Sequence, residues 1–175
     1  MDKIRDSADI LQPEKEETYQ FIEKLLSSVK ENFSTNRVHL GMDEAVMLGL
    51  GNYLKENGYK KGSLIIEEHC NRVVDICRKL ELKPMIWSDM YITANSTGGY
   101  YDLPENTDCS KWEKPKKDLG LVYWDYYHAD TRTYEKMLDI HAQLSDNVIF
   151  AGGSWIWNGI SPNYSKTYAC TKAAL

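Results

Sequence analysis

The feature that most constrains the fold of this chain is a regular alternation of short apolar segments with longer amphipathic ones. The short segments are typical of buried strands and cover residues 37–42, 83–90, 119–127 and 147–157. Apolar side chains recur at helical spacing over residues 16–33, 63–81 and 131–145, with a short helix expected within 44–62 and a partial one after Pro162. This order predicts an α/β fold in which crossover helices join parallel strands.

Acidic or aromatic side chains follow each of the four apolar segments. The four ends are Asp43-Glu44, Trp87-Ser88-Asp89, Tyr123-Trp124-Asp125 and Ser154-Trp155-Ile156-Trp157. Ligands of α/β folds bind at the carboxyl ends of the strands, so these ends are expected to converge on one site. A doubly wound open sheet is the alternative architecture, but the chain carries no glycine-rich phosphate-binding motif.

Composition narrows the class of ligand. The chain has 12 Tyr and 5 Trp but only 3 Phe, so rings with a polar group outnumber the purely apolar one. Such rings stack on the apolar faces of sugars while their hydroxyl and indole groups make hydrogen bonds. A core with polar rims would use the same residues, so composition leaves both a sugar-binding cleft and ordinary packing open.

Charge and hydropathy exclude several other classes. A net charge of −5 without a basic run argues against nucleic acid as a partner. No apolar stretch approaches the roughly 20 residues of a membrane helix, and the first residues lack the apolar region of a signal peptide. We therefore expect a cytoplasmic protein with reduced thiols. The cysteines and histidines lack metal-ligand spacing, so neither a metal nor another cofactor is expected.

Asp43 and Glu44 stand side by side directly after the first apolar segment. One interpretation makes them the acidic first turn of the next helix, where negative side chains interact favourably with the helix dipole. The other makes them a reactive pair at a strand end, diverging toward different parts of one sugar, with one carboxyl protonated and the other ionised. The two residues alone leave both interpretations open.

The segment HLGMDEA, residues 39–45, resembles the His-x-Gly-x-Asp-Glu motif of glycoside hydrolase family 20, the exo-β-N-acetylhexosaminidases. The segments WSDM, YWDYY and GGSWIWNG follow in the order of that family, and the resemblance covers nearly all of residues 16–175. It implies a (β/α)8 TIM barrel that is incomplete here. Residues 1–175 would form a partial catalytic domain with about strands 4–7 and their helices.

The resemblance also implies a reaction, hydrolysis of terminal non-reducing β-linked N-acetylglucosamine or N-acetylgalactosamine with retention. Glu44 would be the general acid and base, and Asp43 would orient the 2-acetamido group of the substrate. The carbonyl oxygen of that group would attack the anomeric carbon, as in the substrate-assisted exceptions to the two-carboxylate rule. Because this nucleophile is tethered to its target, the protein has only to orient it.

The other strand ends would bind the sugar. The resemblance implies that the Tyr123 hydroxyl holds the acetamido carbonyl and that Asp125 binds a sugar hydroxyl. Trp87, with Trp155 or Trp157, would wall the acetamido pocket and form the floor under the ring, although core packing explains any single Trp equally well.

Two further residues complete the predicted site. Asp89 would either bind substrate or cap the following loop, and the residues alone favour neither role. His39 begins the motif and is expected to lie behind the residues that touch the sugar.

The chain departs from the family pattern in two places. Members often carry Glu two residues after the last Trp of the site, whereas Trp155 is followed by Ile156 and Trp157, and Trp157 by Asn158 and Gly159. No residue matches the arginine that the first barrel strand supplies. The first departure puts recognition of the sugar's O4 and O6 in doubt. The second means that the arginine contact to the sugar hydroxyls has no counterpart in this sequence.

The number of strands raises a separate question. A full barrel needs eight strands and roughly 250 residues, so the chain is either a fragment or a naturally short half-barrel. We expect its open edges to be hidden by self-association or by loops, and turnover by this chain alone to be weak or absent.

Two other functions compete with hexosaminidase activity. The first is a non-catalytic carbohydrate-binding or assembly module derived from such a barrel. The second is an ordinary retaining glycosidase with Asp125 as nucleophile opposite Glu44, which requires carboxyl groups about 5–5.5 Å apart.

Overall fold

Strand order in the sheet follows chain order, and every pair of neighbouring strands is parallel. The computed structural model describes residues 2–175. Its strands are β1 (Arg37–His39), β2 (Lys83–Trp87), β3 (Gly120–Trp124) and β4 (Val148–Ala151). Parallel strands in chain order with helical crossovers are the arrangement of a (β/α) barrel. The predicted fold class, a partial α/β barrel, is confirmed.

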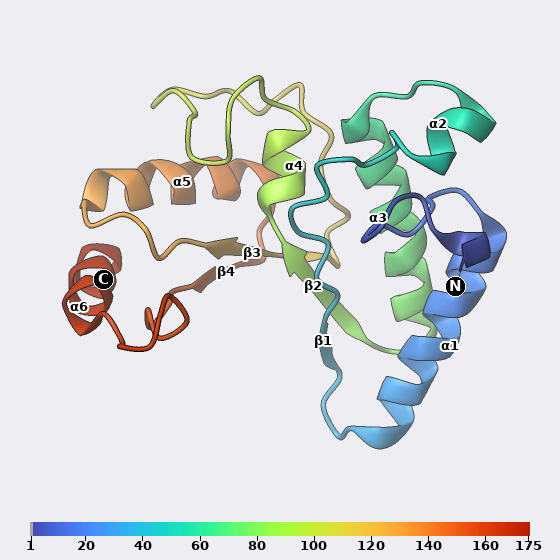
Figure 1. The fold of residues 1–175 in the computed structure, drawn as a ribbon, viewed down its shortest axis with the longest axis horizontal. Helices are drawn as coiled ribbons and strands as arrows, with labels where there is room; N and C mark the ends of the chain where they lie inside the picture. The colour runs from blue at the N-terminus through green and yellow to red at the C-terminus, as the bar shows by residue number, and fades with distance from the viewer. Residues whose placement is uncertain (1) are drawn as a thin grey trace.

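The long helices follow the predicted amphipathic segments. They are α1 (Glu16–Asn32), α3 (Gly62–Lys79) and α5 (Thr131–Leu144), and the last partial helix is α6 (Tyr164–Ala174). Figure 1 shows α1 and α3 side by side next to β1 and β2, and α5 next to β3. The shorter helical elements are η1 (Asp2–Ile4), α2 (Asn52–Asn57) and α4 (Asp89–Thr93). Of these, α4 was not expected from the sequence.

The two faces of the sheet have different surroundings. Ile86 in β2 and Tyr123 in β3 are fully buried in the core that α3 and α5 form with the sheet. Because successive side chains of a strand point to opposite faces, Trp87 and Trp124 lie on the other face. The Trp87 ring there meets the His39 ring of β1, with centroids 4.5 Å apart. This second face is the inner side of the barrel arc.

The segment after β1 differs from its prediction. β1 stops at His39 rather than at residue 42, because Gly41 and Met42 have φ values of 72° and 66° and leave the extended conformation. Residues 46–50 form turns, and α2 begins only at Asn52. The interpretation of Asp43 and Glu44 as the first turn of a helix is therefore wrong.

The other strands end at different points of the predicted polar ends: β2 includes Trp87, β3 includes Tyr123 and Trp124, and β4 stops before its polar end. β2 gives way to α4 at Asp89, and β4 stops before Gly152 and Gly153. At the end of β3, the Asp125 carboxylate accepts the backbone N–H of Tyr127 at 2.9 Å and turns the chain away from the sheet. The predicted ligand-binding ends thus comprise the last residues of β2 and β3 and the loops that follow the four strands.

The N-terminal segment holds the loop that follows Asp43 and Glu44. An antiparallel bridge joins Arg5 to Leu11, and the buried Asp6 between them reaches across to the loop. Its carboxylate accepts the backbone N–H of Tyr53 at 2.6 Å and of Gly49 at 3.1 Å. A Cβ at Gly51 would lie 2.1 Å from the Asp6 carbonyl oxygen, so glycine is required for this approach.

The connection from α4 to β3 is long and irregular, and it contains Gly98, Gly99, Pro104 and Pro115. It brings Tyr100 and Tyr101 into ring contact with Trp124. Across residues 2–175, none of the helices combines the length and apolarity that a membrane span requires.

Candidate active site

The acidic pair lies on a turn with unusual backbone geometry. Glu44 has a φ of 49° and Met42 a φ of 66°, in the left-handed region that residues other than glycine seldom adopt. Trp155, at the end of β4, has a φ of 46°. Such conformations persist only where the surroundings enforce them, and they gather at functional sites. Two of the predicted site residues, Glu44 and Trp155, are therefore held in strained backbone.

Asp89 holds the Glu44 turn in place. Its Oδ2 accepts the backbone N–H of Glu44 at 2.8 Å, and its Oδ1 accepts the indole N–H of Trp124 at 3.3 Å. Only 4% of Asp89 is exposed. Burial raises the pKa of Asp89, while the two hydrogen bonds act in the opposite direction. One buried carboxylate thus joins the ends of β1, β2 and β3.

A cavity opens where these residues meet. Glu44, Asp89, Tyr100 and Trp124 are among the residues that line it, and its volume is about 640 Å³. This size is in the range of small-molecule sites. The cavity combines one exposed carboxylate, one buried carboxylate and two aromatic rings, which together suit a ligand with both hydroxyl groups and an apolar face.

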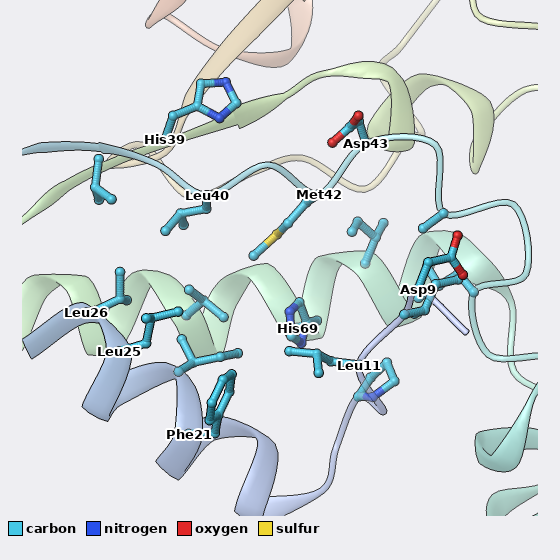
Figure 2. Close-up of a pocket in the computed structure, with 18 of the residues that line it drawn as sticks. Asp9, Leu11, Phe21, Leu25, Leu26, His39, Leu40, Met42, Asp43 and His69 are labelled. Atoms are coloured by element: carbon cyan, nitrogen blue, oxygen red, sulfur yellow. The ribbon is translucent and has the colours of Figure 1, made fainter. Parts of the chain in front are cut away.

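Asp43 faces a different space from its neighbour. It lies at the rim of a groove of about 490 Å³ between α1, α3 and the segment after β1. Figure 2 shows Asp43 above this groove, with Leu40 and Met42 pointing down toward α3 and His69. The two acids therefore diverge, and contact of both with one ligand stays a prediction. Both Asp43 and Glu44 are exposed, and neither is enclosed by protein.

His39 supports the turn that carries the acids. Its Nδ1 lies 3.1 Å from the backbone nitrogen of Gly41 and accepts that N–H, while its ring rests on Trp87. Burial lowers the pKa of His39, and the negative charge of Asp43 partly offsets this effect. These contacts suit the supporting role predicted for His39. The Trp87 ring packs against the His39 ring, and its contact with a sugar stays a prediction.

A row of aromatic rings crosses the strand ends. The consecutive ring pairs have centroids 5.1 to 5.5 Å apart and run through Tyr100, Trp124, Tyr126, Trp157 and Trp155. The Trp155 indole N–H donates to the Tyr126 carbonyl, and Lys166 Nζ lies 3.8 Å from the centroid of the Trp155 ring. The row connects the Glu44 cavity to the two tryptophans predicted at the end of β4.

Tyr126 lies in the middle of this row, between Trp124 and Trp157. Its pKa is raised, first by burial and then by neighbouring groups that include the negative charges of Glu44 and Asp43. Its ring also stacks on Trp124, with an interplanar angle of 29°. Tyr126 therefore connects Trp124 to Trp157 in the row, and the sequence alone does not single it out.

Tyr123 and Asp125 lie on the other side of β3. Tyr123 is fully buried with its ring 4.8 Å from His141 in α5, and its hydroxyl donates to Asp125 Oδ2 at 2.9 Å. Asp125 is 1% exposed and also accepts from the backbone of Tyr127 and from both the backbone N–H and Nδ1 of His128. The hydroxyl and the carboxylate are thus engaged with protein partners. Sugar binding by these residues would require their hydrogen bonds to open.

The alternation of the strand separates Tyr123 from Trp124 but does not say which of them faces the core. Tyr123 and Trp124 are consecutive, so they face opposite sides of β3, and the inward-facing Trp124 shares its parity with Tyr126. The apolar run GLVYW gives no indication of which parity faces the core, because its first four residues are all buried. Only the position of α5 distinguishes the two sides.

Comparison with known proteins adds family-level information. The profile described as "Glycosyl hydrolase family 20, catalytic domain" matches residues 2–138 of this chain. No curated protein sequence matches.

Solved structures resemble the chain at low sequence identity. One is the GH20 beta-N-acetylhexosaminidase from Streptomyces coelicolor A3(2), with 13% identity, a TM-score of 0.51, and coverage of 84% of this chain and 23% of that one. Another is described as a Glycoside Hydrolase Family 20 beta-N-Acetylglucosaminidase, with 16% identity, a TM-score of 0.42, and coverage of 89% and 26%. The chain thus spans about a quarter of the length of each of these structures.

Proposed function

Because this chain belongs to glycoside hydrolase family 20, we propose that it carries part of a site for hydrolysing terminal non-reducing β-linked N-acetylhexosaminides. The observation that carries this proposal is the arrangement of Glu44 and Asp43. The two acids follow one strand, occupy a strained turn that Asp89 and His39 hold, and face separate spaces.

In the proposed first step, Glu44 gives its proton to the glycosidic oxygen as the bond from that oxygen to the anomeric carbon breaks. The acetamido carbonyl oxygen of the substrate forms a new bond to the anomeric carbon, and the aglycone leaves as an alcohol. Asp43 accepts the amide N–H and stabilises the positive charge on the cyclised group. The nucleophile is part of the substrate, so its orientation is the main task of the protein.

In the second step, Glu44 takes a proton from water as the water oxygen attacks the anomeric carbon. The bond to the acetamido oxygen breaks, which restores the acetamido group and the protonated Glu44. Glu44 therefore acts first as acid and then as base, and the configuration of the anomeric carbon is retained. Its exposure supports this exchange with water.

We assign the contact to the acetamido carbonyl to Tyr126. The Tyr126 ring stacks on Trp124, and burial together with the negative charges of neighbouring groups, which include both acids, raises the pKa of Tyr126. The Tyr123 hydroxyl already donates to Asp125. In this proposal Trp157 and Trp155 extend the aromatic wall, and the buried Asp125 shapes the turn after β3 rather than touching sugar.

Binding without turnover is the second candidate function. It is favoured by the exposure of both acids, because neither lies in an enclosed pocket that would exclude water from a reaction. The ordinary retaining mechanism has less support. Its proposed nucleophile, Asp125, accepts four hydrogen bonds from Tyr123, Tyr127 and His128 and is 1% exposed.

One set of assays separates these functions. A chromogenic β-N-acetylhexosaminide is incubated with the wild type, with Glu44→Gln and with a matched control, Glu31→Gln on the exposed side of α1. A thiazoline mimic of the cyclised intermediate is added as inhibitor and as ligand. Turnover that the mimic blocks and only Glu44→Gln abolishes supports hydrolysis, whereas tight binding of the mimic without turnover supports the binding module. Neither binding nor turnover would contradict both.

A further inference from the structure

A second polar cluster lies beneath the site, inside the core. Ser88 and His141 are fully buried, and Tyr100 is 7% exposed. The Ser88 Oγ lies 2.6 Å from the Tyr100 hydroxyl and 2.6 Å from His141 Nε2. The proposed reaction uses none of these three groups, yet a buried polar network is costly unless every member is satisfied.

The direction of each hydrogen bond follows from the tautomer of His141. Its Nδ1 lies 2.5 Å from the Met137 carbonyl oxygen, which can only accept, so Nδ1 carries the proton. Burial lowers the pKa of His141 to about 4, so the ring is neutral at pH 7 and Nε2 is an acceptor. Two hydroxyls lie within reach of this acceptor, Tyr100 at 3.4 Å and Ser88 at 2.6 Å. Ser88 is the closer donor, so we assign the bond to His141 to Ser88, and the Ser88 oxygen then accepts from Tyr100 at 2.6 Å.

Ser88 and Tyr100 connect this buried polar cluster to residues of the candidate site. Ser88 directly precedes Asp89 in sequence, and the Tyr100 ring stacks on Trp124 with centroids 5.1 Å apart. Trp124 donates to one oxygen of Asp89, and the Glu44 N–H donates to the other. A continuous set of contacts thus runs from α5 through the core to the backbone of Glu44.

We propose that His141 is a positioning residue that fixes Asp89, and through it Glu44, from the helix layer. Ser88 and Tyr100 carry the connection. The neutral ring with its proton on Nδ1 gives Ser88 one acceptor and one donor neighbour, so the Ser88 hydroxyl has one orientation. The two hydrogen bonds anchor the Ser88 side chain to the core, and this anchor holds the backbone from which the next residue, Asp89, extends. The inference rests on the proposed function only in assigning a purpose to Glu44.

The buried Ser88 and His141 pair does not form a second nucleophilic site. Both side chains have no exposed surface, and the Ser88 oxygen is already engaged on two sides. A nucleophilic serine needs an acyl or glycosyl carbon within contact distance. The pair is therefore assigned to positioning rather than to chemistry.

The test measures hydrogen exchange of the Glu44 backbone amide, which donates to Asp89. His141→Leu removes the acceptor for Ser88, and His141→Gln returns an acceptor oxygen near the place of Nε2. We expect the protection of the Glu44 amide to fall roughly tenfold in His141→Leu, the size expected for loss of one hydrogen bond. His141→Gln should recover part of it.

The matched control is Ile140→Val, the buried neighbour in α5 that lies outside the polar chain. It removes core volume but leaves Ser88 its partner, so the Glu44 amide should keep its protection. Tyr100→Phe provides a milder variant if His141→Leu fails to fold, because it removes one hydroxyl and retains the ring on Trp124. Two results would overturn the inference. One is an equal loss of Glu44 amide protection in Ile140→Val and His141→Leu, and the other is unchanged protection in both His141→Leu and Tyr100→Phe.

Two further measurements separate this inference from the proposed function. Nitrogen-15 spectra of the histidine rings should show His141 neutral with its proton on Nδ1, and a proton on Nε2 at pH 7 would overturn the assignment. Binding of the thiazoline mimic is then compared in the same variants. If the wild type does not bind the mimic, the proposed function is contradicted, but the hydrogen-exchange result remains valid. If the wild type and His141→Leu bind the mimic equally well, the positioning role of His141 is contradicted.

Discussion

The backbone N–H of Glu44 donates to Oδ2 of Asp89 at 2.8 Å, across a separation of 45 residues. This bond ties the loop after β1 to the first residue of α4, just beyond β2. Because Asp89 is buried and also accepts the indole N–H of Trp124, the position of the Glu44 backbone depends on two neighbouring strands. The general acid and base of the proposed reaction is therefore positioned by its main chain, while its exposed carboxylate remains free for substrate.

Asp89→Asn tests this dependence. An Asn side chain has one acceptor oxygen, so it can satisfy either the Glu44 N–H or the Trp124 indole but not both. We expect the free energy of unfolding in urea to fall by about 1–3 kcal/mol, as for one buried donor left without a partner. Asp146→Asn, at an exposed position after α5, is the control and should be nearly neutral. Equal stability of the two variants would contradict the role of Asp89.

Tyr126→Phe tests the assignment of the acetamido contact. Loss of the hydroxyl should weaken binding of the thiazoline mimic about tenfold, the effect of one hydrogen bond to a ligand. The ring would still stack on Trp124, so stability should change little. Tyr123→Phe is the competing variant, and Tyr164→Phe at a 63% exposed position is the control. A larger loss of affinity in Tyr123→Phe than in Tyr126→Phe would return the contact to Tyr123.

Much of the fold could be predicted from the sequence, because strand and helix periods are local. The helix predicted over 16–33 is α1, the helix predicted over 131–145 is α5, and the four strands occur in the predicted order. The strand ends were less predictable. Where β3 stops depends on the Asp125 side chain accepting from its own turn, and apolar patterning does not encode such a contact.

The candidate site was predictable in its acids and less so in its aromatic residues. Asp43 and Glu44 form a short motif, and their divergence follows from being consecutive. The face on which an aromatic ring of β3 lies depends on where α5 packs, which is a long-range property. The ligand contact of Tyr123 therefore stays a prediction, and in the structure its hydroxyl donates to Asp125.

The buried His141 should make stability depend on pH. In the unfolded chain its pKa is near the ordinary 6.5, whereas burial lowers the folded pKa to about 4. Between these values the unfolded state binds a proton that the folded state does not, so this contribution to stability is full above pH 6.5 and is lost as pH falls toward 4. The loss is on the order of 1 kcal/mol per pH unit within that window.

Urea unfolding of the wild type and of His141→Gln at pH 7 and pH 5 measures this contribution. The variant lacks the titrating ring, so its stability should fall less between the two pH values than that of the wild type. Other titrating groups affect both proteins alike and cancel in the comparison. Parallel changes in the two proteins would contradict a depressed pKa at His141.

The outer edge of β1 leads to a prediction about association. The ladder bonds to β2 use the Asn36 carbonyl at 2.7 Å and the Leu40 N–H at 2.9 Å. Residues of the opposite parity, such as His39, therefore point their backbone groups away from β2. Within residues 2–175 no strand pairs with that edge. Beside it lies the groove of Figure 2, where Leu25 is 53% and Phe21 is 36% exposed.

An open strand edge next to exposed apolar side chains favours pairing with another chain. We therefore expect this chain to self-associate as its concentration rises, as measured by size-exclusion chromatography with light scattering. Leu25→Glu places a charge in the groove and should shift the distribution toward monomer. Lys24→Glu makes a larger change in charge at the neighbouring, exposed position of α1 and should leave association largely intact. A monomer at every concentration, or equal dissociation by both variants, would show that this edge and groove do not hold copies together.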